Sequence, residues 1–215
     1  MKKENHTLQI VYIILLYLQV AFSLWCLWGV QTEKWKWAIF LFCPWVEILF
    51  FIIAVILGIG SVRESFWAYH NDDLEYCLKA MLKLKYGLVP FFVLNLIGMS
   101  ALCCVVLMMC AIGGGNLTLV AVTAGVFGAY TWFMMLPGGA YAFQVARFAE
   151  REGKTTQGWL IVHMLLQCLV LVDVADTAYL AGKHWNRGKA GAFVIGPICV
   201  IAFIIWIAVL LTELL

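Results

Sequence analysis

Charged residues are scarce in this sequence. They make up 12% of its 215 residues, whereas 65% are hydrophobic and the mean hydropathy is +0.96. Soluble domains contain about 25% charged and about 45–50% apolar residues. A water-soluble fold of this size would leave much of that apolar surface exposed, so the composition excludes a soluble protein. No stretch is polar and long enough for a separate soluble domain, and we expect one integral membrane domain over residues 1–215.

Motifs for chemistry are also lacking. The eight cysteines include no CxxC pair, and nearly all lie in apolar segments, which predicts a packing role. The sequence contains neither HExxH nor GxSG. Asp173 and Asp176 match the start of the CDP-alcohol phosphotransferase signature, but Thr177 stands in place of its glycine and no second aspartate pair follows. We therefore expect no enzymatic activity, no metal and no cofactor. The net charge of only +2 gives no indication of nucleic-acid binding.

Long apolar segments dominate what is present. About 20 apolar residues, at about 1.5 Å per residue, cross the roughly 30 Å hydrocarbon core of a bilayer. Tryptophans near several segment ends, such as Trp37 and Trp159, agree with the preference of this side chain for the membrane interface. The sequence predicts an all-α, polytopic transmembrane bundle with six spanning helices. The predicted spans are residues 8–30, 37–61, 86–112, 117–143, 159–182 and 190–212.

The positive charges are distributed unevenly between the two faces that six spans define. Nine Lys and Arg side chains lie on the face of the N-terminus and five on the other, and three of those five belong to residues 183–189. Connections rich in Lys and Arg stay in the cytoplasm. We therefore expect a multi-pass protein of the plasma membrane with both termini in the cytoplasm.

Residues 62–85 form the longest predicted connection. Residues 71–73 (Asn-Asp-Asp) offer a helix N-cap, and apolar residues then recur at positions 74, 77, 78, 81 and 82, the spacing of one helical face. Glu75 and Lys79 are spaced for an ion pair on a helix. The pattern predicts a short cytoplasmic amphipathic helix over residues 71–85. Its candidates for contact with anionic lipid or with a cytoplasmic partner are Lys79, Lys83 and Lys85.

The fifth predicted span, residues 159–182, carries His163, Gln167, Asp173 and Asp176. An ionisable side chain at the bilayer centre costs about 2.5 kcal/mol or more on insertion scales, and such groups face a bundle interior or a wet cavity. On one helix most of these side chains share a face. We therefore expect this span to be the inner helix of the bundle. His163 and Asp173 would lie about 15 Å apart along its axis, as two points on a path.

Glu47 and Asn95 reach a similar depth in the second and third predicted spans, each shortly after a proline. One interpretation is a proton- or cation-responsive site between the second, third and fifth spans. The other is a network of interhelical hydrogen bonds, each worth about 0.6 kcal/mol, that fixes helix packing. For the two aspartates, pairing with the basic residues of 183–189 is a further alternative. The candidate intramembrane polar site comprises Glu47, Asn95, His163, Gln167, Asp173 and Asp176.

The predicted layout leaves two functions open. Six spans, cytoplasmic termini and a helix in the first inner loop resemble, in layout alone, the permease half of type-2 ABC exporters, in which that helix docks the ATPase. The first hypothesis is a transport-associated, permease-like subunit that works in the bilayer with a cytoplasmic or membrane partner. The alternative is a non-transporting structural or regulatory membrane protein whose buried polar residues serve packing only. Small residues at Ala121, Gly125 and Ala129 suit close packing within the chain or with a second copy in a homo-oligomer.

Overall fold

The computed structural model describes residues 6–31, 36–113, 117–169 and 172–188. These residues form six helices, and none of them is in a strand, so the all-α prediction is confirmed. The helices are α1 (Thr7–Gln31), α2 (Lys36–His70), α3 (Leu74–Gly113), α4 (Leu117–Arg151), α5 (Gln157–Leu166) and α6 (Val172–Trp185).

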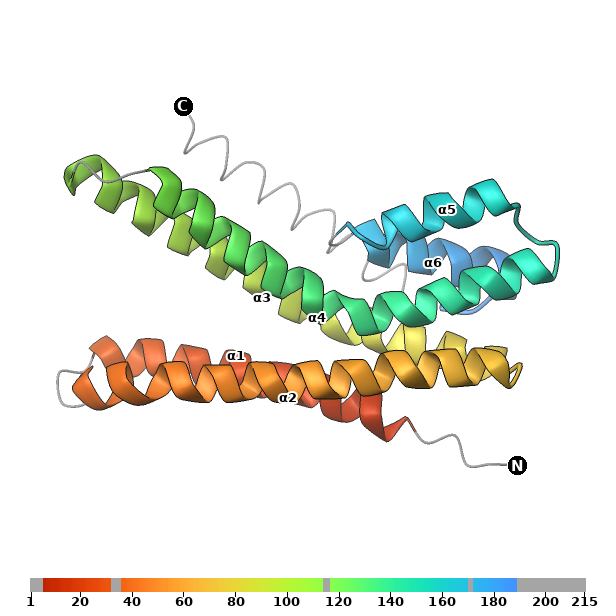
Figure 1. Cartoon of the computed structure of the whole chain (residues 1–215), viewed down its shortest axis with the longest axis horizontal. Helices are drawn as coiled ribbons and strands as arrows, with labels where there is room; N and C mark the ends of the chain where they lie inside the picture. The colour runs from red at the N-terminus through yellow and green to blue at the C-terminus, as the bar shows by residue number, and fades with distance from the viewer. Residues whose placement is uncertain (1–5, 32–35, 114–116, 170–171, 189–215) are drawn as a thin grey trace.

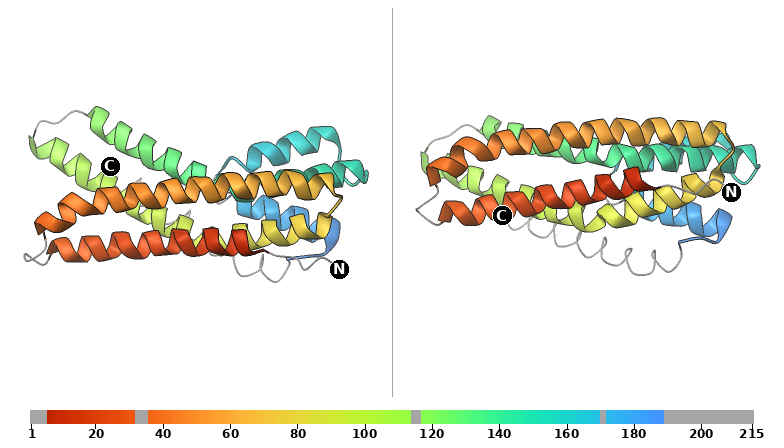
Figure 2. Two further views of the ribbon diagram at one scale, coloured as in Figure 1. Left: turned by 60° about the horizontal axis from the view of Figure 1, so that its bottom comes forward. Right: turned by 90° about the horizontal axis from the view of Figure 1, so that it is seen from below.

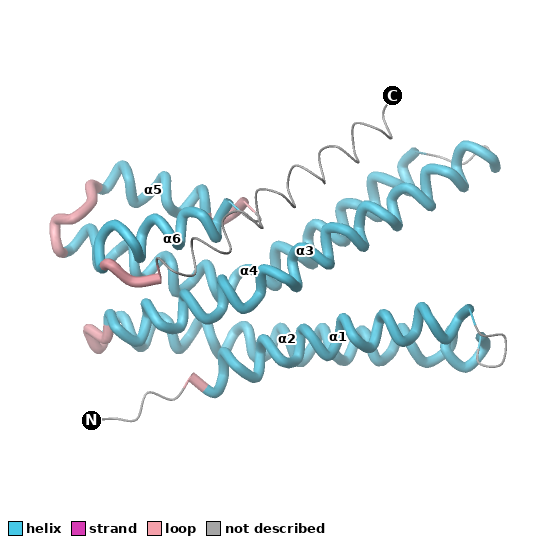
Figure 3. Tube along the Cα trace, turned by 180° about the vertical axis from the view of Figure 1, so that it is seen from behind, coloured by secondary structure: helices cyan, strands magenta, loops and turns pink. Residues whose placement is uncertain are grey.

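The four long helices form two antiparallel pairs. α1 lies along α2, and α3 lies along α4 (Figure 1, Figure 3). The two pairs lie together near α5 and α6 and diverge toward their other end (Figure 1). The short helices α5 and α6 stay at the same end of the molecule in the other views (Figure 2). Where the pairs meet, a buried core joins α1, α3 and α4 and includes Tyr12, Leu88, Phe92, Met134 and Tyr141.

Helices α2, α3 and α4 are longer than the thickness of a bilayer. α3 has 40 residues and α2 and α4 have 35 each, which corresponds to roughly 60 and 50 Å, against about 40–45 Å for a bilayer with its head groups. α1, α2 and α3 each contain a stretch long and apolar enough to cross a membrane. α3 has no charged residue after Lys85 and α4 none before Arg147. The charged parts of both helices therefore lie at the end of the molecule beside α5 and α6. We call this end the basic end. It carries Arg63, Lys79, Lys83, Arg147 and Arg151.

The first four predicted spans fall within α1 to α4, but six spans are not confirmed. The sixth, residues 190–212, lies outside the described residues. The prediction of one continuous helix over residues 159–182 is wrong, because α5 ends at Leu166, a turn follows over residues 167–169, and α6 begins at Val172. α5 and α6 fold back on each other as a hairpin, with His163 against Asp176. In a continuous helix these two residues would lie about 20 Å apart.

The α5–α6 hairpin returns the chain to the basic end. The Tyr86 hydroxyl donates to the Gly188 carbonyl at 3.2 Å, and the Arg187 guanidinium lies 3.8 Å from a Glu75 carboxylate oxygen. These contacts place the residues after α6 beside the first half of α3. The prediction that residues 183–189 lie on the face opposite the N-terminal basic residues is therefore wrong for the described part of that segment.

A tight turn of residues 71–73 joins α2 to α3. Asp73 Oδ1 accepts a hydrogen bond from the Tyr76 amide at 3.0 Å, which confirms the predicted N-cap. No separate amphipathic helix follows, because α3 runs without interruption from Leu74 to Gly113. The apolar face of residues 71–85 packs inside the protein, where Cys77 and Met81 are completely buried. The predicted interfacial helix is thus the first third of α3, and its apolar face covers the other helices and not lipid.

A disulfide links α1 to α2 at the end of the molecule away from the basic end. It joins Cys26, near the end of α1, to Cys43, near the start of α2. The predicted packing role is therefore wrong for these two cysteines. Cys77, Cys103 and Cys168 are free thiols.

Candidate functional site

A buried ion pair joins α3 to α6. Lys85 Nζ donates to Asp173 Oδ2, and the exposed fractions of the two side chains are only 2% and 0%. Asp173 lies in the first turn of α6, where the helix dipole stabilises a negative charge. Val89 and Val174 pack beside the pair on the same two helices. Lys85 is therefore not available for the predicted contact with lipid or a partner.

Gly138 of α4 makes room for the lysine. A methyl group on Gly138 would lie 3.1 Å from Lys85 Cε and 3.2 Å from Cδ, closer than ordinary van der Waals contact. The backbone of α4 consequently passes directly over the stem of Lys85. A glycine at this position lets the lysine reach Asp173 between α3 and α4.

Asp176 holds the side chains of His163 in α5 and of Gln167 directly after it. His163 Nδ1 lies 2.5 Å from Asp176 Oδ1, and Gln167 Nε2 donates to Asp176 Oδ2 at 2.7 Å. Because a carboxylate only accepts hydrogen bonds, the proton of a neutral imidazole is assigned to Nδ1. Gln167 Nε2 also lies 3.4 Å from Thr177 Oγ1. The two aspartates thus pair with Lys85 and His163, and not with the basic residues of 183–189.

Glu47 belongs to a different group. Its carboxylate accepts hydrogen bonds from Gln19 Nε2, at 2.8 Å, and from the Ser23 hydroxyl, both on α1. The Tyr130 hydroxyl of α4 donates to Gln19 Oε1 at 2.8 Å. Glu47 therefore connects α2 to α1 and, through Gln19, to α4.

Asn95 is separate from both groups. Its Nδ2 donates to Thr131 Oγ1 on α4 at 2.8 Å. The Thr131 hydroxyl in turn donates to the Phe127 carbonyl one helical turn earlier. The structure thus does not bring the six candidate residues into one site: Asn95 and Glu47 each bond elsewhere, and only His163, Gln167, Asp173 and Asp176 come together.

A fourth polar group, around Glu64, was not predicted from the sequence. The Glu64 carboxylate of α2 accepts hydrogen bonds from Tyr76 OH at 2.6 Å, Gln9 Nε2 at 2.9 Å and Tyr141 OH at 3.3 Å. These donors come from α3, α1 and α4, so one carboxylate joins all four long helices. The available signal was an acidic residue soon after the predicted end of the second span, but α2 continues past that end to His70.

The exposed lysines of α3 lie on the surface of the basic end. Lys79 Nζ lies 3.1 Å from Glu75 Oε1, which confirms the predicted ion pair, and Lys83 is exposed. Their contact with lipid or a partner stays a prediction.

Near the end of α6, partial burial lowers the pKa of His184, and the positive charge of Lys183 lowers this pKa further.

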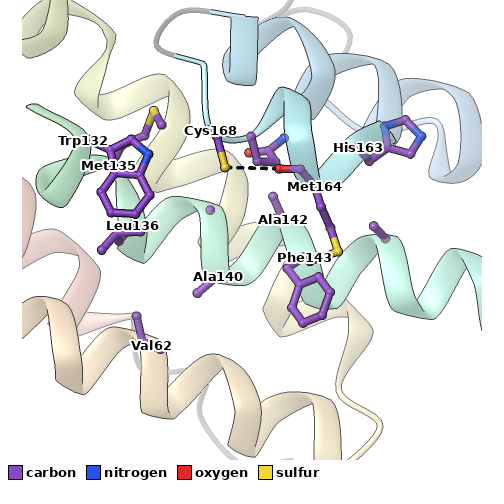
Figure 4. Close-up of a pocket in the computed structure, with 13 residues that line it drawn as sticks. Val62, Trp132, Met135, Leu136, Ala140, Ala142, Phe143, His163, Met164 and Cys168 are labelled. Atoms are coloured by element: carbon purple, nitrogen blue, oxygen red, sulfur yellow. Dashed lines mark hydrogen bonds between the residues drawn. The ribbon is translucent and has the colours of Figure 1, made fainter. Parts of the chain in front are cut away.

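A cavity of about 300 Å³ lies between α2, α4 and α5. This volume is at the lower end of the range for small-molecule sites. His163 and Gln167 line it, so the polar group of α5 borders the cavity. The rest of the wall is apolar and includes Val62, Trp132, Leu136, Phe143 and Met164 (Figure 4).

No three His, Cys, Asp or Glu side chains within the described ranges are grouped so that they could hold a metal ion.

Comparison with other proteins places the chain in a family without assigning it an activity. Neither a curated protein nor a solved structure matches the chain. Residues 2–187 match the model of a family of unknown function (DUF6652), and the chain belongs to this family.

Proposed function

We propose that the protein is a non-transporting integral membrane protein, structural or regulatory in role, whose buried polar residues hold its helices together. The observation that supports this proposal is the pairing of the polar groups. Glu47 bonds to α1, Asn95 bonds to α4, and Asp173 pairs with Lys85 of α3. A transport path needs polar groups that follow one another and can exchange partners with a substrate. Groups that are separated and already paired favour a packing role.

The substitution Glu47→Gln tests this proposal. It replaces hydrogen bonds to a charged acceptor by neutral ones, which are weaker by about 1 kcal/mol. We expect the purified variant to unfold at a lower temperature in detergent than the wild type. Glu152→Gln is the control: its carboxylate forms an exposed ion pair with Lys154 after α4, and pairs of this kind contribute little, so its unfolding temperature should change much less. Equal stability of Glu47→Gln and its control would contradict the packing role.

We further propose that the basic end faces the cytoplasm and that the protein lies in the plasma membrane. With α5 and α6 folded back, Lys183 and Arg187 join the other basic residues at that end, which strengthens the positive-inside bias beyond that of the six-span layout. The Cys26–Cys43 disulfide lies at the opposite end, and disulfides persist on the oxidising, extracytoplasmic side. Gln9, at the start of α1, bonds to Glu64 near the basic end, which favours a cytoplasmic N-terminus.

A transport-associated subunit is the second candidate. The observation that favours it is the chain of hydrogen bonds from Tyr130 through Gln19 to Glu47, which crosses three helices within their apolar lengths. Such a subunit would bind a cytoplasmic or membrane partner through exposed residues such as Lys83, or a second copy through the exposed small-residue stripe around Gly125. Affinity purification from native membranes separates the candidates. A co-purifying ATPase would favour transport and contradict the first proposal.

A further inference from the structure

We propose that His163 and Asp176 form a buried proton-binding site, and that the bound proton strengthens the contact between α5 and α6. The inference deepens the regulatory form of the role proposed above and rests on it, with the pH on the side of the basic end as the signal. Three observations support it: the balance of buried charge, the contact between imidazole and carboxylate, and the access to the imidazole from the cavity.

The buried polar group of α3, α5 and α6 has an excess of one negative charge while His163 is neutral. Lys85 and Asp173 form an ion pair whose charges sum to zero. Asp176 adds a second carboxylate one helical turn after Asp173, and the two carboxylates repel each other. Their side chains are only 0% and 2% exposed. Because an unbalanced buried charge is costly, one bound proton stabilises the group by bringing the sum to zero.

His163 is the residue that takes up this proton. The Asp176 carboxylate contacts His163 at 2.5 Å and Gln167 at 2.7 Å, and of these two side chains only the imidazole can gain a positive charge. Nδ1 already donates to Asp176 in the assigned tautomer, so the proton comes from water and the new N–H bond forms at Nε2. The neutral hydrogen bond between α5 and α6 then becomes a stronger, charge-assisted one. Histidine ordinarily gains its charge between pH 5 and 8.

The cations of α6 oppose a positive charge on His163 but lie farther away than Asp176. The Tyr179 ring lies between them, with its centroid 5.9 Å from that of His163 and 4.8 Å from Lys183 Nζ. His184 and His163 repel each other when both are charged. Electrostatic interactions weaken with distance, so the carboxylate in direct contact has the larger effect.

The cavity between α2, α4 and α5 connects the imidazole to the surface. His163 lines this cavity, although its side chain is only 4% exposed. Met164 and Cys168 line it too and are exposed, so water can reach the imidazole from there (Figure 4). Cys168 is the other titratable residue of the wall, because the described lining residues of α2 and α4 include none. α3 contributes Lys85, whose charge Asp173 balances.

Histidine NMR of the full chain in detergent, between pH 5 and 8, tests proton binding. The four histidines are labelled with nitrogen-15, and the His163 signals are identified by their loss in His163→Gln. We expect His163 to change from imidazolium to neutral imidazole within this range. Asp176→Asn should lower its proton affinity at least tenfold, because an adjacent opposite charge is worth about one to three pH units. Glu152→Gln, which removes an exposed carboxylate, is the control and should leave the affinity unchanged.

Thermal unfolding in detergent tests the effect on the hairpin, and it does not require Asp176→Asn to fold. His163→Gln can still donate a hydrogen bond to Asp176 but binds no proton. The stability that the proton adds is present at pH 6 and is lost as the pH rises to 8. We therefore expect the wild type to exceed His163→Gln in unfolding temperature by roughly 2–4 °C more at pH 6 than at pH 8.

Each measurement can overturn one part of the inference. A His163 signal that keeps one protonation state from pH 5 to 8, or equal proton affinity in Asp176→Asn and Glu152→Gln, would overturn the proton-binding site. An equal difference between wild type and His163→Gln at both pH values would overturn the effect on the hairpin. Neither result alters what Glu47→Gln should do, so the packing role can fail or hold separately.

Discussion

Lys85→Met should strongly lower the free energy of unfolding, because it removes a buried positive charge. Methionine keeps most of the apolar stem of Lys85 but leaves the Asp173 carboxylate buried without its cation. Removing one partner of a buried pair costs about 3–5 kcal/mol, because an uncompensated charge then stays inside the protein. Asp173→Asn should cost a similar amount, since it leaves the ammonium group without its counter-charge.

Removal of both charges should cost far less than removal of one. Replacing a buried ion pair by apolar residues of similar size is neutral or stabilising by about 1–4 kcal/mol. We therefore expect Lys85→Met/Asp173→Leu to be more stable than either single variant. The coupling energy of this double-mutant cycle should reach several kcal/mol, which distinguishes a direct ion pair from two independent packing positions.

The assay is thermal unfolding of the purified variants in one detergent, with the folded fraction measured by gel filtration. Lys83→Met is the matched control, because Lys83 is exposed two residues away on the same helix. Its effect should stay within about 0.5 kcal/mol. If Lys85→Met unfolds at the same temperature as Lys83→Met, the buried pair is refuted. A double variant as unstable as the sum of the single variants would also refute it.

Two further predictions concern the approach of α4 to α3 and the path of the chain. Gly138→Ala should cost about 1–3 kcal/mol, because its methyl group displaces the stem of Lys85, whereas Gly139→Ala meets open space. Thermal unfolding of both variants checks this, and equal stability would contradict the close approach. Epitopes inserted after Gly153 and after Gly188 should both be hidden from antibody in intact cells and exposed after permeabilisation. Access to only the second epitope in intact cells would contradict the α5–α6 hairpin and support a single fifth span.

The positions of the first four helices could be predicted from apolar length alone, and α1, α2 and α3 each contain a stretch that is long and apolar enough to cross a membrane. A segment of more than 20 apolar residues has few alternatives to a spanning helix, and the predicted spans fall within α1 to α4. The N-cap at Asp73 was equally predictable, because it depends on neighbouring residues only. Length does not show where such a helix ends outside the bilayer. For this reason residues 71–85 were assigned to an interfacial helix and Glu64 to a connection.

The α5–α6 hairpin could not be predicted, because no proline or run of glycines marks the turn after Leu166. Apolar length favoured one span, while the pairing of His163 and Gln167 with Asp176 requires two helices that face each other. That pairing is a tertiary contact, and helical periodicity carries no information on it. The partner of Asp173 was hidden for the same reason, since Lys85 resembled the exposed lysines near it in sequence.

Depth along a helix was predictable for Glu47 and Asn95, but the direction of their side chains was not. Glu47 bonds to Gln19 and Ser23 of α1, a helix to which the sequence analysis assigned no polar role. Asn95 bonds to Thr131, whose hydroxyl also bonds to its own helix. Short hydroxyl and amide residues in apolar helices are common, so their pairing becomes visible only when the neighbouring helix is known.

A distance between α5 and α6 tests the central feature of the fold most directly. Spin labels at Trp159→Cys and Tyr179→Cys, in a background with the free cysteines replaced, report this distance by pulsed electron paramagnetic resonance. Both positions are exposed, and the ring centroids of the two native side chains lie 6.1 and 5.9 Å from that of His163. The hairpin predicts a separation well below the roughly 30 Å that 20 residues of continuous helix would give. A distance near 30 Å would contradict the hairpin and the polar pairing built on it.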